Sequence, residues 1–280
     1  HAAQSPHVIT AENPGVLPPP PATFTAGPLL FVERILDDGT RFHGQSFGFE
    51  KPVAGEVVFN TAMTGYPESL TDPSYAGQLM TLTYPLIGNY GVPPFSIEPN
   101  GLATFMESQK IHADAIIVSD YSFEYSHWNA VESLASWLKR EHVPGITGID
   151  TRELTKVLRE HGVMMGKIVF DDEPDNIPQA KYAGVNYVDK VSCKEIIRYN
   201  EGAGKKKIVL VDCGVKNNII RCLLKRDVTI IRVPWNYDFN ELEYDGLCLA
   251  NGPGDPNTCD AAVQNIRKSL EKSVIPTFGI

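Results

Sequence analysis

Cysteine is missing from the first 192 residues of this 280-residue chain, and basic residues are outnumbered by acidic ones. The five cysteines stand at positions 193, 213, 222, 248 and 259, without the C-x-x-C spacing of a zinc or redox site. This pattern favours a reducing compartment. The chain has 25 Lys and Arg against 34 Asp and Glu, a net charge of −9. That balance argues against a nucleic-acid-binding protein and a basic membrane-surface protein.

Long apolar runs are missing as well. No run approaches the roughly 20 residues that cross a bilayer, so we expect no membrane span. The first 28 residues contain seven of the 21 prolines and neither Lys nor Arg, unlike a secretory signal or a transit peptide. Residues 1–28 are therefore predicted to form a disordered or polyproline-like tail. The first residue is His1, which is compatible with prior removal of a targeting segment; the expected location is the cytoplasm, with the mitochondrion as the alternative.

The rest of the chain has the composition of a globular protein, with 42% hydrophobic and 21% charged residues, and its length suggests about two domains. The first domain is expected over residues 29–200, with strands and helices mixed and no simple βαβ alternation. Its predicted strands are 29–36, 41–49, 56–60, 78–84 and 115–118, and its predicted helices are 101–111, 131–142 and one that begins at Asp150 or Thr151.

A second domain is expected over residues 201–280. Residues 171–187 are polar, and the Gly- and Lys-rich segment 201–206 reads as a linker, so a boundary near 195–205 is predicted. Strands and helices then alternate, with strands at 208–212, 228–232, 246–251 and 275–280 and helices at 216–226 and 260–272. Unbroken apolar strands separated by helices indicate a doubly wound parallel sheet. Because the last strand reaches Ile280, we expect this sheet to be the first part of a larger domain.

The turn 251–256, Asn-Gly-Pro-Gly-Asp-Pro, follows one of the predicted parallel strands. Ligands of open α/β sheets bind at the carboxyl ends of strands, and glycines there allow backbone N–H groups to approach an oxyanion. An ordinary turn would have the same composition. Nucleotide binding is a weaker alternative, since Asn257 stands at the third glycine position of G-x-G-x-x-G, and Lys206 replaces the Ser or Thr of a P-loop.

For two other candidate sites, the residue types alone are weak evidence of function. Cys213 ends a predicted core strand, where a nucleophile could stand, but a buried cysteine more often packs as a small hydrophobic residue. The segment 72–75, Asp-Pro-Ser-Tyr, has the composition of a type I turn.

Several stretches together resemble one family. Four of them resemble the N-terminal part of the glutaminase portion of carbamoyl-phosphate synthase: residues 55–59, 65–75, 84–91 and 148–152. Three more resemble the start of its class I (triad) glutamine amidotransferase domain: residues 212–216, 233–235 and 251–256. The resemblance runs in order from about residue 29 to residue 280, and it is similar to the eukaryotic glutamine-dependent type.

The resemblance implies a fold and an activity. It implies a mixed α/β N-terminal domain that docks on the synthetase, and the first half of a flavodoxin-like amidotransferase domain. A cysteine of the family attacks the glutamine carboxamide, and the released ammonia reaches a synthetase that uses ATP, Mg²⁺ and bicarbonate, for pyrimidine or arginine synthesis. A Cys–His pair is suited to this reaction because the thiolate is the nucleophile.

The resemblance also assigns site residues. Ser74, Gly252 and Gly254 are implied to bind glutamine, with the Gly252 N–H as half of the oxyanion hole. The family's nucleophile follows a strand that ends in Phe-Gly-Ile, which here is 278–280. We therefore expect the cysteine, histidine and glutamate of the triad to be absent from these residues, and the chain alone to be inactive. No cofactor or metal is expected in this segment. The alternative is a docking module of the synthetase without glutaminase activity.

Overall fold

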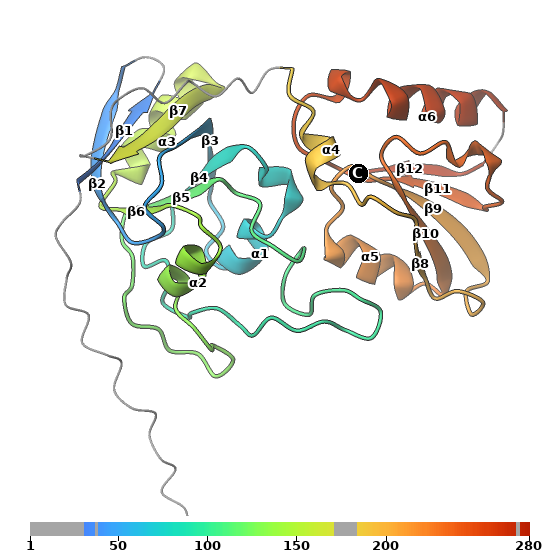
Figure 1. Ribbon diagram of the computed structural model, residues 1–280, viewed down its shortest axis with the longest axis horizontal. Helices are drawn as coiled ribbons and strands as arrows, with labels where there is room; N and C mark the ends of the chain where they lie inside the picture. The colour runs from blue at the N-terminus through green and yellow to red at the C-terminus, as the bar shows by residue number, and fades with distance from the viewer. Residues whose placement is uncertain (1–30, 37–38, 171–183, 273–274) are drawn as a thin grey trace, which may run out of the picture.

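The computed structural model describes residues 31–36, 39–170, 184–272 and 275–280. These residues form two units, a closed barrel of seven strands and a sheet of five strands (Figure 1). The predicted tail at 1–28 and most of the polar stretch 171–187 lie outside the described residues. Within the part that is described, no helix has the length and apolar character needed to cross a membrane.

The barrel contains both parallel and antiparallel pairs. Its strands follow the order β1-β2-β6-β5-β4-β3-β7, and the pairs from β3 through β4 and β5 to β6 are parallel. The strands are β1 (Phe31–Leu36), β2 (Arg41–Ser46), β3 (Val53–Asn60), β4 (Gln78–Leu82), β5 (Ala115–Val118), β6 (Gly145–Thr147) and β7 (Met164–Phe170). The helices of this unit are α1 (Tyr66–Leu70), α2 (Leu134–Arg140) and α3 (Thr151–His161), with a 3₁₀ turn η1 (Pro73–Tyr75).

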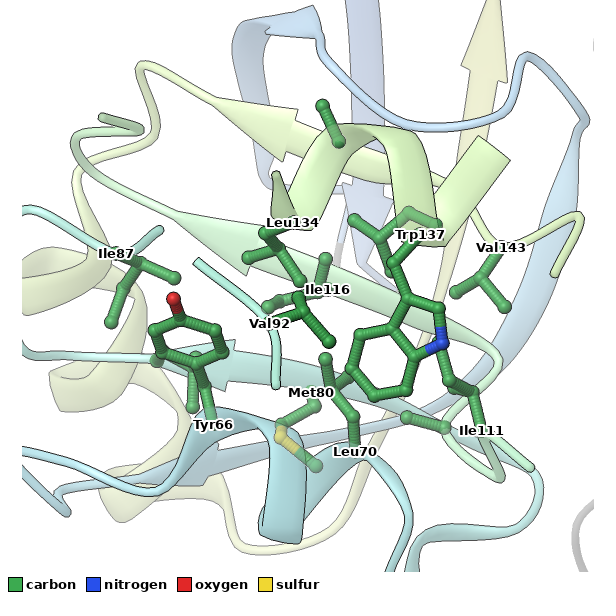
Figure 2. Close-up of a cluster of buried hydrophobic side chains, with 14 of the residues drawn as sticks. Tyr66, Leu70, Met80, Ile87, Val92, Ile111, Ile116, Leu134, Trp137 and Val143 are labelled. Carbon is green, nitrogen blue, oxygen red and sulfur yellow. The ribbon is translucent and has the colours of Figure 1, made fainter. Parts of the chain in front are cut away.

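Two hydrophobic clusters cover the two faces of the central strands. Met80 and Ile116 point into a cluster with Trp137 of α2 (Figure 2). Their neighbours Leu79 and Ile117 point into the other cluster, which α3 closes. This alternation follows from the two-residue period of a strand, and it explains why β5 reads as an unbroken apolar run.

The second unit is a largely parallel sheet with one helix on each face. Its order is β12-β11-β9-β10-β8, and only β8 is antiparallel to its neighbour. Figure 1 shows α5 and α6 on opposite sides of this sheet. The elements are α4 (Tyr187–Val191), β8 (Ile197–Tyr199), β9 (Lys206–Asp212), α5 (Asn217–Leu224), β10 (Val228–Pro234), η2 (Phe239–Glu241), β11 (Gly246–Leu249), η3 (Pro256–Thr258), α6 (Asp260–Lys272) and β12 (Thr277–Gly279). The expected parallel, doubly wound arrangement is confirmed.

The segment 201–205 is not a linker between the two units. It joins β8 to β9 inside the second sheet, and Lys205 N–H donates to the Asp227 carbonyl at 3.0 Å. The second sheet therefore begins with β8, ahead of the predicted start at residue 201. Gly and Lys suit a tight, exposed turn as well as they suit a linker, so composition did not separate the two.

The predicted helix over 101–111 is wrong, because this segment has no regular secondary structure. Its carbonyl groups bond to the second unit: Arg221 Nη2 donates to the carbonyls of Ala103 and Thr104, and Asn217 Nδ2 donates to the Met106 carbonyl at 3.1 Å. These partners replace the i to i+4 bonds of a helix. The predicted helix over 131–142 is shorter, since α2 begins after Ser133, whose hydroxyl accepts from Ser136 N–H.

Candidate functional site

Ser74 and the turn 251–256 lie in contact across the two units. Asn251 Nδ2 donates to Ser74 Oγ at 2.8 Å, although the two residues are 177 positions apart in the chain. Ser74 belongs to η1, and its N–H donates to Asp72 Oδ1 at 2.9 Å, so the Asp72 carboxylate caps that turn. Asn251 follows β11 at the carboxyl edge of the parallel sheet, which is the edge where ligands of such sheets bind.

Gly252 packs too closely on a neighbouring turn to carry a side chain. A Cβ at this position would lie 2.0 Å from the Cys213 carbonyl oxygen. The residue itself is exposed. Within the described residues, the N–H groups of Gly252 and Gly254 have no hydrogen-bond acceptor. Unpaired N–H groups on an exposed glycine and a half-buried one, beside a partly buried serine, are suited to bind an anionic oxygen.

Gly254 has a left-handed backbone, with φ of 79°, which glycine adopts without the steric cost that a Cβ adds. A Cβ there would lie 3.4 Å from the Tyr187 ring, an ordinary contact distance. The requirement at position 254 is therefore mainly conformational, whereas at position 252 it is mainly a lack of space.

Asp212 holds the turn on which Gly252 packs. Its Oδ1 accepts from the N–H groups of Gly214 and Val215 at 2.9 and 2.8 Å, and its Oδ2 accepts from Arg232 Nη2 at 2.6 Å. The Asp212 side chain is fully buried. Burial lowers the pKa of Arg232, but the Asp212 carboxylate and the Tyr199 hydroxyl together outweigh burial and raise it, so the guanidinium stays charged.

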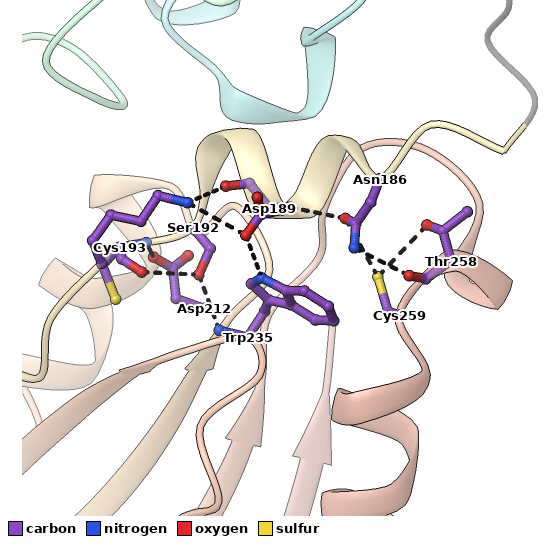
Figure 3. A network of polar contacts seen from close by, with 9 residues as sticks. Asn186, Asp189, Ser192, Cys193, Asp212, Trp235, Thr258 and Cys259 are labelled. Atoms are coloured by element: carbon purple, nitrogen blue, oxygen red, sulfur yellow. Dashed lines mark hydrogen bonds and ion pairs between the residues drawn. The ribbon is translucent and has the colours of Figure 1, made fainter.

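The helix α4 is fastened to the same edge of the sheet by polar contacts (Figure 3). Trp235 Nε1 donates to Asp189 Oδ1 at 3.0 Å, and Trp235 N–H donates to Ser192 Oγ at 3.0 Å. Asn186 Nδ2 donates to the Thr258 carbonyl at 3.0 Å. Tyr187 of this helix lies against Gly254, so α4 forms part of the wall around the turn.

Lys216 is a residue of the site that the sequence pattern does not indicate. Its Nζ lies 2.9 Å from Asp72 Oδ2, the carboxylate that also caps the turn of Ser74. Burial lowers the pKa of Lys216, but the hydrogen bond and charge of Asp72, together with the charges of Glu107 and Tyr75, outweigh burial and raise it. Both residues belong to stretches that carry the family resemblance, yet neither their types nor their spacing shows that they pair across 144 positions.

Four of the five cysteines have the environments of structural residues. Burial raises the pKa of Cys193 and Cys213 to about 12 each. Burial also raises the pKa of Cys248 and Cys259. A thiol with a raised pKa is a poor nucleophile because little thiolate is present. Cys213 contacts apolar side chains in two clusters, which supports its interpretation as a small hydrophobic residue. The described residues contain no group of three metal-ligating side chains.

An apolar cavity of about 790 Å³ lies elsewhere, between α5 and the edge formed by β11 and β12. Leu223, Cys248 and Phe278 are among its lining residues, whereas Ser74 and the turn 251–256 are not. The candidate site is thus defined by polar contacts and free backbone donors and not by this apolar cavity.

Comparison with known families divides the chain as the fold does. Residues 35–168 match the carbamoyl-phosphate synthase small chain, CPSase domain, and residues 209–280 match the class-I glutamine amidotransferase family. The first match covers most of the barrel. The second begins in β9 and includes Gly252 and Gly254.

Curated relatives share nearly half of their aligned residues with the chain. The human mitochondrial carbamoyl-phosphate synthase [ammonia] is 47% identical over 249 residues, 88% of this chain and 16% of that protein. The multifunctional protein pyr1-3 of Dictyostelium discoideum is 48% identical over 263 residues, 88% and 12% respectively. The arginine-specific small chain of carbamoyl phosphate synthase from Saccharomyces cerevisiae is 47% identical over 253 residues, 88% and 61% respectively. The chain thus spans less than two thirds of each of these relatives.

Proposed function

The chain belongs to the carbamoyl-phosphate synthase small-chain family, and on this premise we propose that it supplies the glutamine-binding part of an amidotransferase that delivers ammonia for carbamoyl phosphate synthesis. The observation that carries the proposal is the contact of Ser74 with the turn 251–256 across the two units. The proposed substrate is glutamine, whose carboxamide oxygen gains negative charge when a thiolate adds to its carbon.

Gly252 is proposed to stabilise that charge. Its N–H is exposed and has no acceptor within the described residues, and the absence of a Cβ leaves it close to the turn that Asp212 holds. Such fixed donors act strongly because they need no reorganisation when the charge develops. Ser74 and Gly254 are proposed to contact the amino acid part of glutamine from the two units.

None of the five thiols is proposed to be the nucleophile. Cys193, Cys213, Cys248 and Cys259 have raised pKa values, and Cys222 of α5 lines the apolar cavity, whose lining does not include the turn 251–256. These 280 residues are therefore proposed to bind glutamine and to be inactive alone. ATP and Mg²⁺ are proposed to bind in the synthetase and not in this chain, and the cytoplasm is the proposed location.

A synthetase is the proposed protein partner, because the relatives that match are small chains or parts of large synthetases. Two long loops of the barrel unit suit this role. Residues 84–97 and 119–132 lie side by side, as the hydrogen bond from Val131 N–H to the Val92 carbonyl at 3.0 Å shows. They expose large apolar side chains, among them Leu86, Phe123 and Trp128, the last of which is 87% exposed. Such side chains are typical of protein interfaces.

The test is substitution of Ser74 in the full-length protein with its synthetase. Ser74→Ala is expected to raise the glutamine KM about ten-fold, because one hydrogen bond to the substrate is lost. Synthesis driven by free ammonia should not change. Steady-state rates with each nitrogen source measure both. An equal loss with both sources would contradict the assigned role, and an absence of glutamine-driven synthesis in the wild type would favour the docking module without glutaminase activity.

A further inference from the structure

The side chain of Asn251 touches the serine that is proposed to bind glutamine, yet no role has been assigned to it. We propose that Asn251 is a positioning residue that makes the Ser74 hydroxyl a hydrogen-bond donor toward the substrate. This inference rests on the proposed function. It depends on the direction of a single hydrogen bond, from Asn251 Nδ2 to Ser74 Oγ at 2.8 Å.

The direction of this bond decides what Ser74 can offer. A side-chain amide nitrogen only donates, so Ser74 Oγ is the acceptor. A hydroxyl group has one hydrogen, and that hydrogen is not used in the bond with Asn251. Among the described residues, Ser74 Oγ makes no other hydrogen bond. The hydroxyl hydrogen is therefore free to point at an oxygen of the ligand, such as a carboxylate or carbonyl oxygen of the amino acid.

The second unit also holds the backbone of Ser74, indirectly, through the ion pair of Lys216 with Asp72. Its N–H donates to Asp72 Oδ1, and Asp72 Oδ2 is paired with Lys216 Nζ at 2.9 Å. The backbone contact fixes the location of Ser74, and the Asn251 contact fixes the rotation of its hydroxyl group. These are separate tasks, and only the second depends on the amide of Asn251.

The amide oxygen of Asn251 is a second indication that a ligand binds here. Asn251 Oδ1 is buried and has no hydrogen-bond donor among the described residues. Buried acceptors without a donor are uncommon because they have lost their contact with water. An amino acid substrate has an α-ammonium group, a donor of the kind that Oδ1 lacks.

Asn251→Asp is the sharpest test, because it keeps the size and shape of the side chain and removes its donor. A carboxylate would accept the Ser74 hydrogen and turn it away from the substrate. In the full-length protein with its synthetase, we expect the glutamine KM to rise about ten-fold, as for Ser74→Ala, with ammonia-driven synthesis unchanged. Asn257→Asp is the matched control, since it makes the same change on an exposed residue of the same loop.

Two further readouts separate positioning from a general structural effect. In the double variant Ser74→Ala with Asn251→Asp, the KM should be no higher than in either single variant, because both changes remove one interaction. The KM of Asn251→Asp should also recover as the pH falls and the new carboxyl gains a proton to donate, whereas Ser74→Ala should show no such recovery.

The outcomes distinguish this inference from the proposed function. A wild-type protein that uses glutamine and an Asn251→Asp variant with an unchanged KM would overturn the positioning role alone. Effects of the two substitutions that multiply would also overturn it. A wild-type protein that uses ammonia and not glutamine would overturn both.

Discussion

At the scale of single residues, two glycines of one turn have different reasons to be glycine. Gly252 lacks space for a Cβ, while Gly254 has the space and needs the left-handed backbone. The family resemblance names both as glutamine-binding residues and does not separate them. The distinction comes from the Cys213 carbonyl, which is close to Gly252 only because β9 and β11 are neighbours in the sheet.

Gly252→Ala is expected to lower the glutamine-dependent kcat by about 10²-fold, the order of loss for one oxyanion donor, since the added Cβ must displace the turn. Ammonia-driven synthesis should remain at the wild-type rate. Gly39→Ala is the control, because Gly39 lies between β1 and β2 in the chain, outside the proposed site, and a Cβ there meets no atom within 4 Å. Rates with both nitrogen sources give the comparison. A Gly252→Ala enzyme with normal glutamine turnover would contradict the oxyanion role.

At the scale of elements, the irregular segment 98–107 and helix α5 form the joint between the units. Arg221 Nε of α5 lies 3.0 Å from Glu98 Oε1, and Arg221 Nη2 donates to two carbonyls of the segment. Asn217 N–H donates to the Glu107 carbonyl at 2.9 Å. Leu102 is buried in the core cluster of the second unit. The joint sets the distance between η1, which carries Ser74, and the carboxyl end of β11.

Arg221→Leu is expected to destabilise the protein by about 2–3 kcal/mol, because it leaves backbone carbonyls and the Glu98 carboxylate without their donor. Arg221 is 20% exposed, so solvent compensates little. Arg226→Leu is a control two residues beyond the end of α5, where the exposed arginine side chain donates only to the Cys222 carbonyl among the described residues, and it should change stability by less than about 0.5 kcal/mol. Urea unfolding of the wild type and the two variants measures these changes in the free energy of unfolding. An equal loss of unfolding free energy in the two variants would show that the contacts of Arg221 with the segment 98–107 add no specific stability.

At the scale of the whole molecule, the proposed glutamine site draws on both units, whereas all five thiols belong to the second unit. Ser74 of the barrel contacts Asn251 of the second unit at the proposed site, and the environments of four of the five thiols raise their pKa values. A thiol with a pKa of about 12 is almost wholly protonated at neutral pH.

The 280 residues expressed alone are therefore expected to release no ammonia from glutamine. A coupled ammonia assay at neutral pH measures this, with the full-length protein as the positive comparison. Turnover by the 280-residue chain that a thiol-alkylating reagent abolishes would mean that one of its five cysteines is the nucleophile.

The sequence by itself determined the parts of this protein that depend on local pattern. The parallel strands β9, β10 and β11 and the helix α6 follow from apolar runs and periodicity, and the cap of α3 is one of the two residues expected, Asp150. The pattern failed at 101–111, where tertiary partners for the backbone replaced the helix that local spacing predicted.

Only the tertiary structure decided how the site is assembled. Asn251 and Ser74 lie 177 positions apart, and Lys216 and Asp72 lie 144 apart. A hydrogen bond or an ion pair between residues so far apart in the chain produces no periodic pattern and no local composition from which the sequence could predict it. It exists because the two units pack together, with Arg221 and Asn217 bonded to the segment 98–107, and this packing brings polar side chains of the two units within 3 Å of each other.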